Sequence, residues 1–376
     1  MNSPHAWAEV NLKAIAHNIR ELRRITNPKA CFMAVVKANA YGHGIIEVAR
    51  ESLENGAEAF GVANIEEGIQ LRKAGFDAPV LIFGYTSPMH VKKLIEFNLT
   101  QTVYSYEISG KLSKAAAKYG KKIKVHIKVD TGMGRLGLLG KIKDNSVSKI
   151  LSISRLPTLE LEGIYTHFAT ADESNRSYAD KQFEIFMDLL NRLRIAGLEI
   201  PVTHAANSAA IINMPETHLD MVRAGISIYG LYTSEGVDRS IIKLKPAMEL
   251  KTKIIHLKKV PAGFKVSYGI TYETEKPTTI ATVSIGYADG LNRLLSSNGC
   301  MLVCGQKAPI LGRVCMDLTM LDVGEIPEVV MEKEVVIFGK QGNFSITVDE
   351  IASKINTINY EIVSTIMDRV PRIYLQ

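Results

Sequence analysis

The chain has 376 residues, of which 46% are hydrophobic and 22% are charged, a composition typical of a globular protein with two domains. It contains no run of about 18 apolar residues, so the sequence predicts no membrane-spanning helix. The formal net charge is +6, but the basic residues are scattered among apolar ones and form no aromatic-interleaved stripe, which argues against nucleic-acid binding.

The cysteines and the amino-terminal segment indicate a cellular compartment. Four cysteines are too few for a disulfide framework in a chain of this length. Cys300, Cys304 and Cys315 have no matched set of histidines nearby, so we expect no metal site there. The segment Met1–Glu9 lacks the charged and apolar regions of a secretory signal. These features predict a reduced, cytoplasmic protein that binds neither nucleic acid nor membrane.

Between about residues 31 and 230, short apolar runs alternate with amphipathic segments. The runs have the length and the polar or Gly/Pro boundaries of buried parallel strands. They are Cys31–Lys37, Ala59–Val62, Pro79–Phe83, Thr100–Tyr104, Lys122–Val129, Leu161–His167, Pro201–His204 and Leu219–Arg223. The segments between them have helical periodicity: Ile45–Glu54, Ile65–Ala74, Pro88–Phe97, Glu107–Tyr119, Ser146–Leu156 and Asp180–Ala196. Ser87 followed by Pro88 predicts an N-cap and a first helical position.

Eight strands in this alternation predict an α/β fold, a (β/α)8 barrel of the TIM type. A doubly wound open sheet is the competing fold, but it usually has fewer strands. After about residue 240, alternating apolar segments separated by turns predict a mostly β domain. Its strands are Glu249–Val260, Thr278–Ile285, Met301–Val303, Thr319–Val323 and Glu334–Phe338, followed by one helix, Val348–Ser364. We therefore place a barrel domain at residues 1–240, whose first strand at about 7–11 is a candidate member of the β domain, and a β-rich domain at 241–376.

The sharpest motif is the decapeptide Val35–Gly44, VVKANAYGHG, in which a lysine ends an apolar strand and small residues follow. In a barrel, catalytic groups lie at the carboxyl ends of the strands. Lys37 at such a position would be partly desolvated, which lowers the pKa of its amine and suits it to Schiff-base chemistry. A lysine that merely extends from a strand end into solvent is the alternative that these features leave open.

The decapeptide resembles the cofactor-attachment motif of the alanine racemases, and the resemblance covers nearly the whole chain. It implies a pyridoxal-phosphate-dependent isomerase, with the cofactor on Lys37, that interconverts L-alanine and D-alanine and supplies D-alanine for cell-wall peptidoglycan. It also implies a homodimer whose active site is shared between the two subunits.

Residues 128–137, KVDTGMGRLG, resemble the family's segment after the fifth barrel strand. Gly132 and Gly134 permit tight turns, and the planar guanidinium of Arg135 suits a carboxylate or a phenolate. The resemblance implies that Arg135 contacts the phenolic oxygen of the cofactor and the substrate carboxylate. It further implies that Lys128 carries a carbamate that pairs with Arg135. An outward-facing strand lysine is the alternative for Lys128.

Three further strand ends match the family. His167, in YTHFA, corresponds to the histidine between the catalytic tyrosine and the arginine at the ring nitrogen. A helix start with a hydroxyl suits a phosphate, and barrels often bind phosphate after their seventh and eighth strands. The resemblance places the cofactor phosphate and its surroundings among the following groups: Asn207, Ser208, the backbone of Gly225 and Ile226, and the hydroxyls of Tyr41 and Tyr374.

By the same resemblance, Arg223 in the eighth strand faces the pyridine nitrogen of the cofactor. An arginine stays protonated at neutral pH, so it holds that nitrogen unprotonated. The ring is then a weaker electron sink, which disfavours transamination and suits a reaction that returns the proton to the same carbon.

The β-rich region holds three more matches. Tyr268, in KVSYGITY, is implied to be the second catalytic base and a substrate contact. Tyr287, in SIGYADG, is implied to narrow the entrance, and the backbone of Met316, in GRVCMD, to bind the substrate carboxylate. One departure is Ile270, where we expect a small residue; it removes no functional group.

Racemisation removes the Cα proton on one face and returns it on the other, which takes two bases. The resemblance implies that Lys37 serves D-alanine and Tyr268 serves L-alanine. Because the ordinary pKa of a tyrosine is about 10, the pKa of Tyr268 must be lowered. We expect cationic Arg223, coupled through His167, to lower it.

Three other functions stay open at this point. A racemase of broader range, including serine, would use the same scaffold. A non-catalytic pyridoxal-phosphate carrier shares a barrel and its lysine but lacks the β domain, so Tyr268 and the segment to Gln376 argue against it. A decarboxylase of similar plan would use other motifs and larger substrates.

Overall fold

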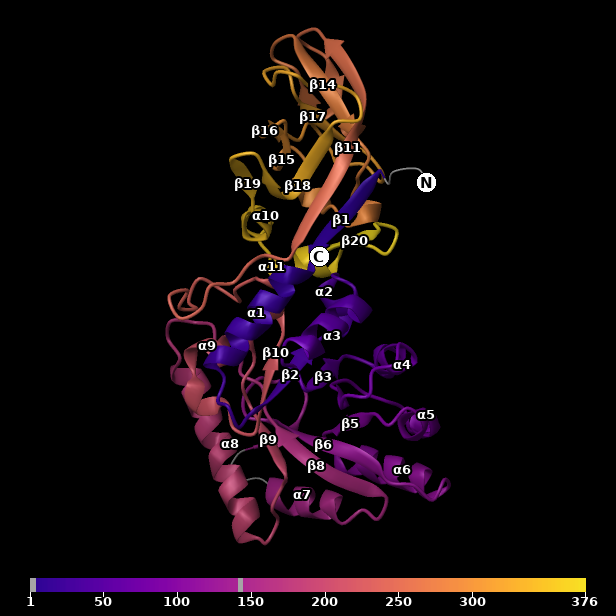
Figure 1. Cartoon of the computed structure of the whole chain (residues 1–376), viewed down its shortest axis with the longest axis vertical. Coiled ribbons are helices and arrows are strands. Elements are labelled where there is room, and N and C mark those ends of the chain that lie inside the picture. The colour runs from indigo at the N-terminus through magenta and orange to yellow at the C-terminus, as the bar shows by residue number, and fades with distance from the viewer. Residues whose placement is uncertain (1–4, 141–144) are drawn as a thin grey trace. The chain divides into compact units, whose positions relative to one another are not determined.

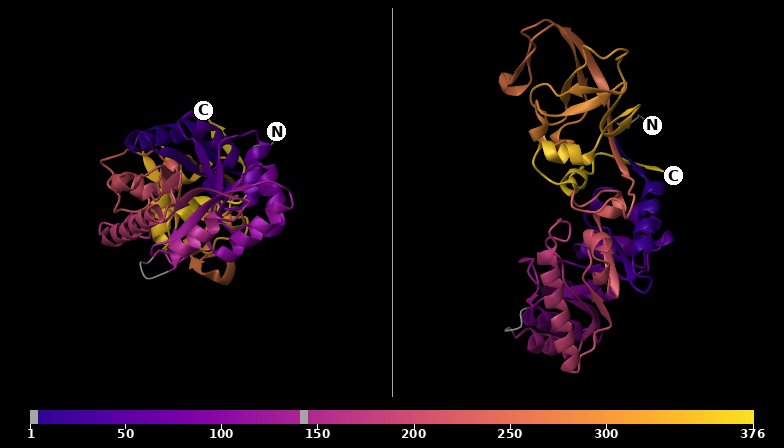
Figure 2. Two further views of the ribbon diagram at one scale, coloured as in Figure 1. Left: turned by 90° about the horizontal axis from the view of Figure 1, so that it is seen from below. Right: turned by 90° about the vertical axis from the view of Figure 1, so that its left-hand side faces the viewer.

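The computed structural model describes residues 5–140 and 145–376 (Figures 1 and 2). The first four residues of the segment Met1–Glu9 therefore lie outside the described residues. The chain forms two compact units. The barrel unit comprises Ala14–Ala40 and Ile45–Pro246, and the β unit comprises the described residues up to Lys13, Tyr41–Gly44 and Ala247–Gln376. None of the described helices combines the length and apolar character needed to cross a membrane.

The barrel unit is built on parallel strands that close on themselves (Figure 1). Each pairs with its neighbour, and the pairing of the strands at the two ends of the series closes the barrel, which confirms the predicted (β/α)8 fold and excludes an open sheet. In spatial order the strands are β5 (Thr100–Val103), β4 (Val80–Ile82), β3 (Ala59–Val62), β2 (Cys31–Val35), β10 (Met221–Ala224), β9 (Val202–His204), β8 (Leu159–Tyr165) and β6 (Ile123–Asp130), with the short β7 (Leu138–Leu139) beside β6.

The helices of the barrel unit confirm the predicted periodicity. Asn64 caps one helix by accepting from Glu67 N–H at 2.9 Å, and Ser105 caps another by accepting from Ile108 N–H at 3.1 Å. The helices are α1 (Leu12–Ile25), α2 (Lys37–Tyr41), α3 (Ile45–Glu54), α4 (Ile65–Lys73), α5 (Val91–Glu96), α6 (Tyr106–Ala117), α7 (Ser146–Ser154), α8 (Ser177–Ile195) and α9 (Ser208–Asn213).

One helix start differs from the prediction. The helix expected from Pro88 begins as a 3-10 turn, Pro88–His90, before α5, and the Ser87 side chain makes no capping bond. Proline at the first position fixes φ but does not select between an α-helix and a 3-10 helix. The sequence therefore indicates where the helix begins but not which type of helix begins there.

The β unit is mostly antiparallel and includes the amino-terminal strand, β1 (Ala6–Asn11), which pairs with β11 (Met248–Val260) and β20 (Arg372–Leu375). A buried cluster of Val260, Val266, Ile280 and Leu311 fills part of its interior. The other strands are β12 (Lys265–Val266), β13 (Tyr272–Glu273), β14 (Thr278–Val283), β15 (Cys300–Val303), β16 (Gln306–Pro309), β17 (Thr319–Asp322), β18 (Glu334–Gln341) and β19 (Phe344–Ile346).

The single helix predicted over Val348–Ser364 is wrong, because two helices occupy this segment: α10 (Val348–Lys354) and α11 (Asn359–Ser364). Asn356 takes a left-handed conformation with φ of 55°, which ends α10. Asparagine tolerates that conformation better than most residues, and the apolar periodicity on either side of it conceals the break.

A buried asparagine ties α1 to the end of the barrel unit. The Asn18 amide donates to the carbonyls of Ile228 (3.0 Å) and Lys245 (2.8 Å) and accepts from Lys245 N–H (2.8 Å). We expect Asn18→Ala to lower the free energy of unfolding by at least about 2 kcal/mol, because three backbone groups lose a partner. Chemical unfolding followed by circular dichroism measures the change. The control, Asn191→Ala on the exposed face of α8, should change it by less than about 0.5 kcal/mol, and equal losses would contradict the role of Asn18.

Candidate active site

The segment that follows β2 has an unusual backbone. Ala38, Asn39, Ala40 and Tyr41 have φ between 51° and 54°, so this turn winds in the left-handed sense. The left-handed conformation costs roughly 1–2 kcal/mol for each residue with a side chain. Such strain persists where the surroundings fix it, and it concentrates at functional sites. The turn places Lys37 at the carboxyl end of a barrel strand, as the sequence predicts.

Side-chain hydrogen bonds hold this strained turn. Glu67 accepts from Ala38 N–H through one carboxylate oxygen and from Ala63 N–H through the other, both at 2.7 Å. Asn39 accepts from Ile45 N–H at 2.9 Å. The carboxylate of Glu67 therefore ties the turn after β2 to the end of β3, a connection that the sequence analysis did not identify.

Lys37 lies in an environment that favours its neutral amine. Burial lowers the pKa of Lys37, and the positive charge of Arg135 lowers it further, whereas Glu67 opposes the change. A neutral amine is the form that attacks a carbonyl and that accepts a proton.

The loop after β6 presents Arg135. One carboxylate oxygen of Asp130 accepts from Gly132 N–H at 2.9 Å and from Gly134 N–H at 3.1 Å, which holds the tight turn that the sequence predicts. Both glycines have positive φ, 139° and 71°. The Arg135 side chain is exposed, so its guanidinium is accessible to an anionic ligand.

Lys128 is a buried lysine within the barrel. It is 5% exposed, and within residues 5–140 and 145–376 its Nζ has no hydrogen-bond partner. The Nζ lies 4.7 Å from the centroid of the Tyr165 ring. Burial, together with the charges of Arg223 and Arg135, lowers the pKa of Lys128 well below its ordinary value. The side chain therefore does not face solvent, in contrast to the outward-facing alternative.

Arg223 organises the end of β10. Its guanidinium donates to the carbonyls of Thr166 (2.8 Å) and Ala205 (2.9 Å) and lies 3.3 Å from His167 Nδ1. It also donates to His204 Nδ1 at 2.9 Å, a partner that sequence analysis did not identify. Burial lowers the pKa of Arg223 to about 10, so it stays protonated at neutral pH.

The structure brings together Ser208 and Gly225, which the family resemblance assigns to one phosphate. Ser208 Oγ accepts from Gly225 N–H at 2.8 Å, and Ile226 begins the next 3-10 turn. The Asn207 side chain accepts from Ala210 N–H at 3.0 Å and so caps α9. Asn207 thus has a structural role in shaping the turn that carries Ser208, and its predicted cofactor contact stays a prediction.

Tyr41 and Tyr374 lie in the β unit. The rings of Tyr41 and Tyr360 have centroids 6.1 Å apart. A Cβ at Gly44 would lie 1.8 Å from the hydroxyl of Tyr374, so only glycine fits beside this tyrosine. The close approach of Gly44 to Tyr374 connects two segments that the sequence analysis singled out separately.

Hydrogen bonds connect the three segments of the β unit that carry Tyr268, Tyr287 and Met316. Ser267 Oγ donates to the carbonyl of Arg313 at 2.7 Å, which joins the Tyr268 segment to the Met316 segment. Tyr287 N–H donates to Cys315 O at 3.0 Å. The carbonyl of Met316 accepts from Ala288 N–H at 2.9 Å, and the contact of the Met316 backbone with a substrate carboxylate stays a prediction. The Tyr268 side chain is 71% exposed.

A small residue is expected at the position of Ile270, and the backbone conformation explains why. Its φ is 51°, a left-handed conformation that a β-branched side chain disfavours. Ser267 and Gly269, on either side of Tyr268, also have positive φ, 68° and 72°. The turn that carries Tyr268 is therefore conformationally strained.

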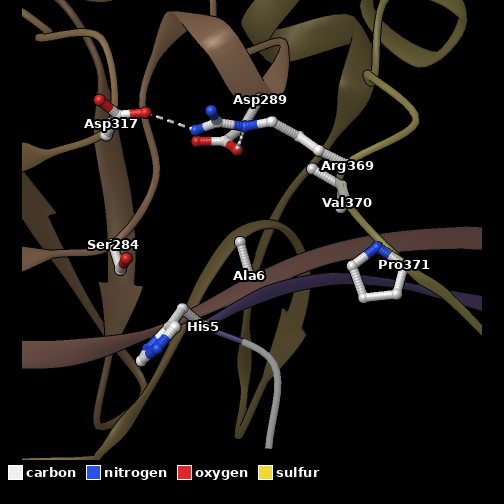
Figure 3. A pocket seen from close by; sticks show the side chains of 8 residues that line it. All are labelled: His5, Ala6, Ser284, Asp289, Asp317, Arg369, Val370 and Pro371. Carbon is white, nitrogen blue, oxygen red and sulfur yellow. Dashed lines mark hydrogen bonds and ion pairs between the residues drawn. The ribbon is translucent and has the colours of Figure 1, made fainter.

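A pocket of about 540 Å³ lies beside these motifs in the β unit (Figure 3). Arg369 reaches across it and donates to Asp289 and to Asp317, each at 2.6 Å. The second carboxylate oxygen of Asp289 accepts from Gly286 N–H at 2.8 Å. A Cβ at Gly286 would lie 2.3 Å from Met316 O. Asp289 and Arg369 thus fix the turn that carries Tyr287 against the segment that carries Met316.

Comparison with known proteins gives one consistent result. The profile of the alanine racemase N-terminal domain matches residues 10–233, and that of the alanine racemase C-terminal domain matches residues 247–374. An alanine racemase of Desulfosudis oleivorans is 53% identical over 380 residues, which cover 100% of this chain and 97% of the relative.

Solved structures have the same fold. The alanine racemase of Bacillus anthracis with bound L-Ala-P is 39% identical, with a TM-score of 0.95 over 100% of this chain and 96% of that chain. A histidine racemase from Leuconostoc mesenteroides is 32% identical, with a TM-score of 0.90 over 100% of both chains. One architecture therefore serves racemases of different amino acids.

The contacts in Figure 3 give a test of which carboxylate anchors the Tyr287 turn. We expect Asp289→Ala to lower the free energy of unfolding by about 1–3 kcal/mol, because the buried N–H of Gly286 loses its acceptor. Asp317→Ala is the matched control, since Asp317 also contacts Arg369 but is 56% exposed. It should change stability by less than about 0.5 kcal/mol in the same chemical unfolding measurement. Equal losses would contradict the role of Asp289.

Proposed function

The chain belongs to the alanine racemase family, and we infer that it interconverts L-alanine and D-alanine. The observation that carries this inference is the environment of Lys37 at the end of a barrel strand. Burial and the charge of Arg135 lower the pKa of its amine, and the strained turn that follows fixes its position. Both family domains match, so a barrel-only carrier does not account for the chain. A relative of the same fold binds L-Ala-P.

The cofactor that we propose is pyridoxal 5'-phosphate, and the groups of the barrel unit fit it. Its aldehyde needs an amine with a lowered pKa, which Lys37 offers. Its phosphate needs hydroxyl and backbone N–H donors; the Ser208 hydroxyl lies at the start of α9, 2.8 Å from Gly225 N, whose N–H donates to it in this structure. Arg223 offers a permanently protonated donor for the ring nitrogen. When bound, this cofactor would supply an electron sink for the electron pair left at Cα once the proton is removed.

Residues of this chain then do the binding and the proton transfer. Arg135 and the backbone N–H of Met316 bind the carboxylate of alanine, which orients Cα. Lys37 Nζ holds or releases the proton on one face and Tyr268 Oη on the other, so the two directions of the reaction use opposite bases. His167 contacts Arg223, and we assign to it the link between that arginine and Tyr268. Tyr287 and Tyr374 limit the space for the side chain.

A racemase of broader range is the second candidate, and the histidine racemase of the same fold favours it. A fold shared by alanine and histidine racemases does not itself limit the size of the substrate side chain. A chiral assay on a panel of L-amino acids, with CO2 release monitored, separates the candidates. Racemisation of alanine at a kcat/KM at least tenfold above that of serine supports the narrow function. Equal values favour the broad one, and CO2 release would indicate a decarboxylase.

We place the reaction in the cytoplasm, where D-alanine is used for peptidoglycan. All four cysteines are unpaired, as expected in a reducing compartment.

We also propose a homodimer in which Tyr268 of one subunit completes the site of the other. The supporting observation is that Tyr268 is 71% exposed on a turn of the β unit, although the proposed chemistry needs its hydroxyl at the substrate. In a two-fold dimer, one such contact generates two equivalent sites.

Subunit exchange tests the two bases and the shared site together. Lys37→Ala and Tyr268→Ala homodimers should each be nearly inactive. Mixed in equal amounts, they should recover about a quarter of wild-type activity, because half the dimers are mixed and each of these has one intact site. Exchange is verified by mass spectrometry of differently tagged chains. If activity stays absent after complete exchange, both bases come from one subunit. If Lys37→Ala alone retains activity, Lys37 is not the cofactor lysine.

Lys128 is proposed to carry a carbamate that pairs with Arg135. The support is its buried Nζ, which has no hydrogen-bond partner among the described residues, and its lowered pKa, since only a neutral amine reacts with CO2. Exchange with carbon-13 bicarbonate should give a carbamate signal in the carbon-13 spectrum. Lys128→Ala should remove the signal, and Lys124→Ala, at a partly exposed lysine of the same strand, should retain it. A signal indifferent to Lys128→Ala would reject the assignment.

A further inference from the structure

Four strands of the barrel, β10, β9, β8 and β6, lie side by side in this order (Figure 1). Polar side chains from these strands contact one another in a line. Glu162 lies 3.4 Å from His126 Nε2, and His126 Nδ1 lies 2.9 Å from His204 Nε2. His204 Nδ1 lies 2.9 Å from the guanidinium of Arg223. The two imidazoles are 3% and 0% exposed. We call Glu162, His126 and His204 the Glu162 relay.

The positions of the protons on the two rings follow from the contact with Arg223. A guanidinium only donates, so His204 Nδ1 must accept from Arg223. A neutral imidazole has one donor and one acceptor, so the proton of His204 is on Nε2 and points at His126 Nδ1. His126 must then carry its own proton on Nε2, where it points at the carboxylate of Glu162. All three contacts run in one direction, from Arg223 to Glu162.

The charge states agree with this order. Burial, followed by the charge of Arg223, lowers the pKa of His204 well below its ordinary value, which keeps the ring neutral. The hydrogen bond from His126 is the main cause that lowers the pKa of Glu162 to about 2, so its carboxylate is ionised. Hydrogen bonds in such a chain polarise one another, which lets Glu162 act on Arg223 through the two rings.

The surrounding structure fixes the two rings. A Cβ at Gly163 would lie 2.6 Å from the His126 ring, so the glycine makes room for the imidazole between two strands. The ring of Tyr165 stacks on that of His204 at 4.6 Å and 12°. Glu162 itself is held by Lys124 at 2.8 Å. The rings therefore have little freedom to flip and exchange the nitrogens that face each other.

The relay also connects the positive charge of Arg223 to a negative charge. Within the described residues, no carboxylate forms an ion pair with this guanidinium, which is 4% exposed. An uncompensated buried charge is costly. Two hydrogen bonds through the His204 and His126 rings, followed by the 3.4 Å contact between His126 Nε2 and Glu162, connect Arg223 to an ionised carboxylate.

We propose that Glu162, His126 and His204 are positioning residues that act through Arg223: they set a single tautomer at each ring and supply the buried guanidinium with a distant counter-charge. Arg223 is thereby kept as a fixed, protonated donor at the end of β10. This inference rests on the proposed function for its effect on the reaction, and on the barrel geometry alone for the tautomers.

The tautomers are measured directly on the wild-type protein. With nitrogen-15 histidine, long-range proton–nitrogen correlations show which ring nitrogen carries the proton, and His126→Asn and His204→Asn assign the signals. We expect the proton on Nε2 in both rings. A proton on Nδ1 of either ring would overturn the proposal whatever the variants do.

Glu162→Gln tests the effect on Arg223, because it removes the charge and keeps the shape. We expect a single His204 tautomer to become a mixture, and kcat for alanine to fall roughly tenfold with KM changed less than twofold. Glu160→Gln, an exposed glutamate two residues away on the same strand, is the matched control and should leave both unchanged. Gly163→Ala, which displaces the His126 ring, should reproduce the spectral change.

The outcomes separate the two proposals. If Glu162→Gln lowers only the thermal midpoint and leaves kcat and the His204 signals as in the wild type, the relay is merely structural and the inference is wrong. If the wild-type protein does not racemise alanine at all, the proposed function is wrong. The ring-proton measurement and the Glu162→Gln spectra still decide whether the relay exists in that case.

Discussion

Positive charge confined within the barrel is the constraint on which the rest of this structure depends. Arg223 and Lys128 are 4% and 5% exposed, and neither forms an ion pair with a carboxylate in the part of the chain that the structure describes. Lys37 follows β2, the strand that pairs with β10, and Arg135 lies on the loop after β6. Burial lowers the pKa of Lys37, Lys128 and Arg223, and cationic neighbours lower each of them further. Both lysines are therefore shifted toward their neutral forms, whereas Arg223, with a pKa of about 10, stays charged at neutral pH.

These positively charged groups explain why each group proposed to bind there is an anion. A phosphate, a substrate carboxylate and a lysine carbamate are all anions, and each would reduce the repulsion among the cations. Burial and the same repulsion lower the pKa of Lys37, which suits it to the proposed roles of nucleophile and proton acceptor. The binding and catalysis proposed for this barrel therefore depend on one electrostatic property of its strand ends.

The sequence predicted the strands well because buried parallel strands are short, apolar and bounded by polar residues. It also placed Lys37 and Arg223 at strand ends, where the barrel fold makes position informative. It did not predict the left-handed turn after Lys37, because Ala38 and Ala40 carry no mark of positive φ. The break at Asn356 was missed for the related reason that apolar periodicity continues across it.

The Glu162 relay was missed because it depends on barrel closure, which no local pattern reports. His126 and Glu162 stand within strands, and they meet only because β6 and β8 are neighbours. One local signal was available: Gly163 interrupts a strand, and a glycine in a strand interior often marks a close approach of another group. The limits of the two domains and the roles of the individual site residues stay predictions, because they depend on contacts between parts of the molecule rather than on local pattern.

The two units present their site residues on different kinds of structure, strand ends in the barrel unit and strained turns in the β unit. The barrel unit presents its charged groups at the ends of strands, or on short turns that follow them, where neighbouring strands fix their separation. The β unit presents Tyr268, Tyr287 and Met316 on turns, with Ser267 at φ of 68° and Gly290 at 105°. Turns change shape by substitution more readily than paired strands do. A racemase of this fold can therefore keep the electrostatics that proton transfer at Cα requires and change its substrate through the turns, which is consistent with the alanine and histidine racemases that share the architecture.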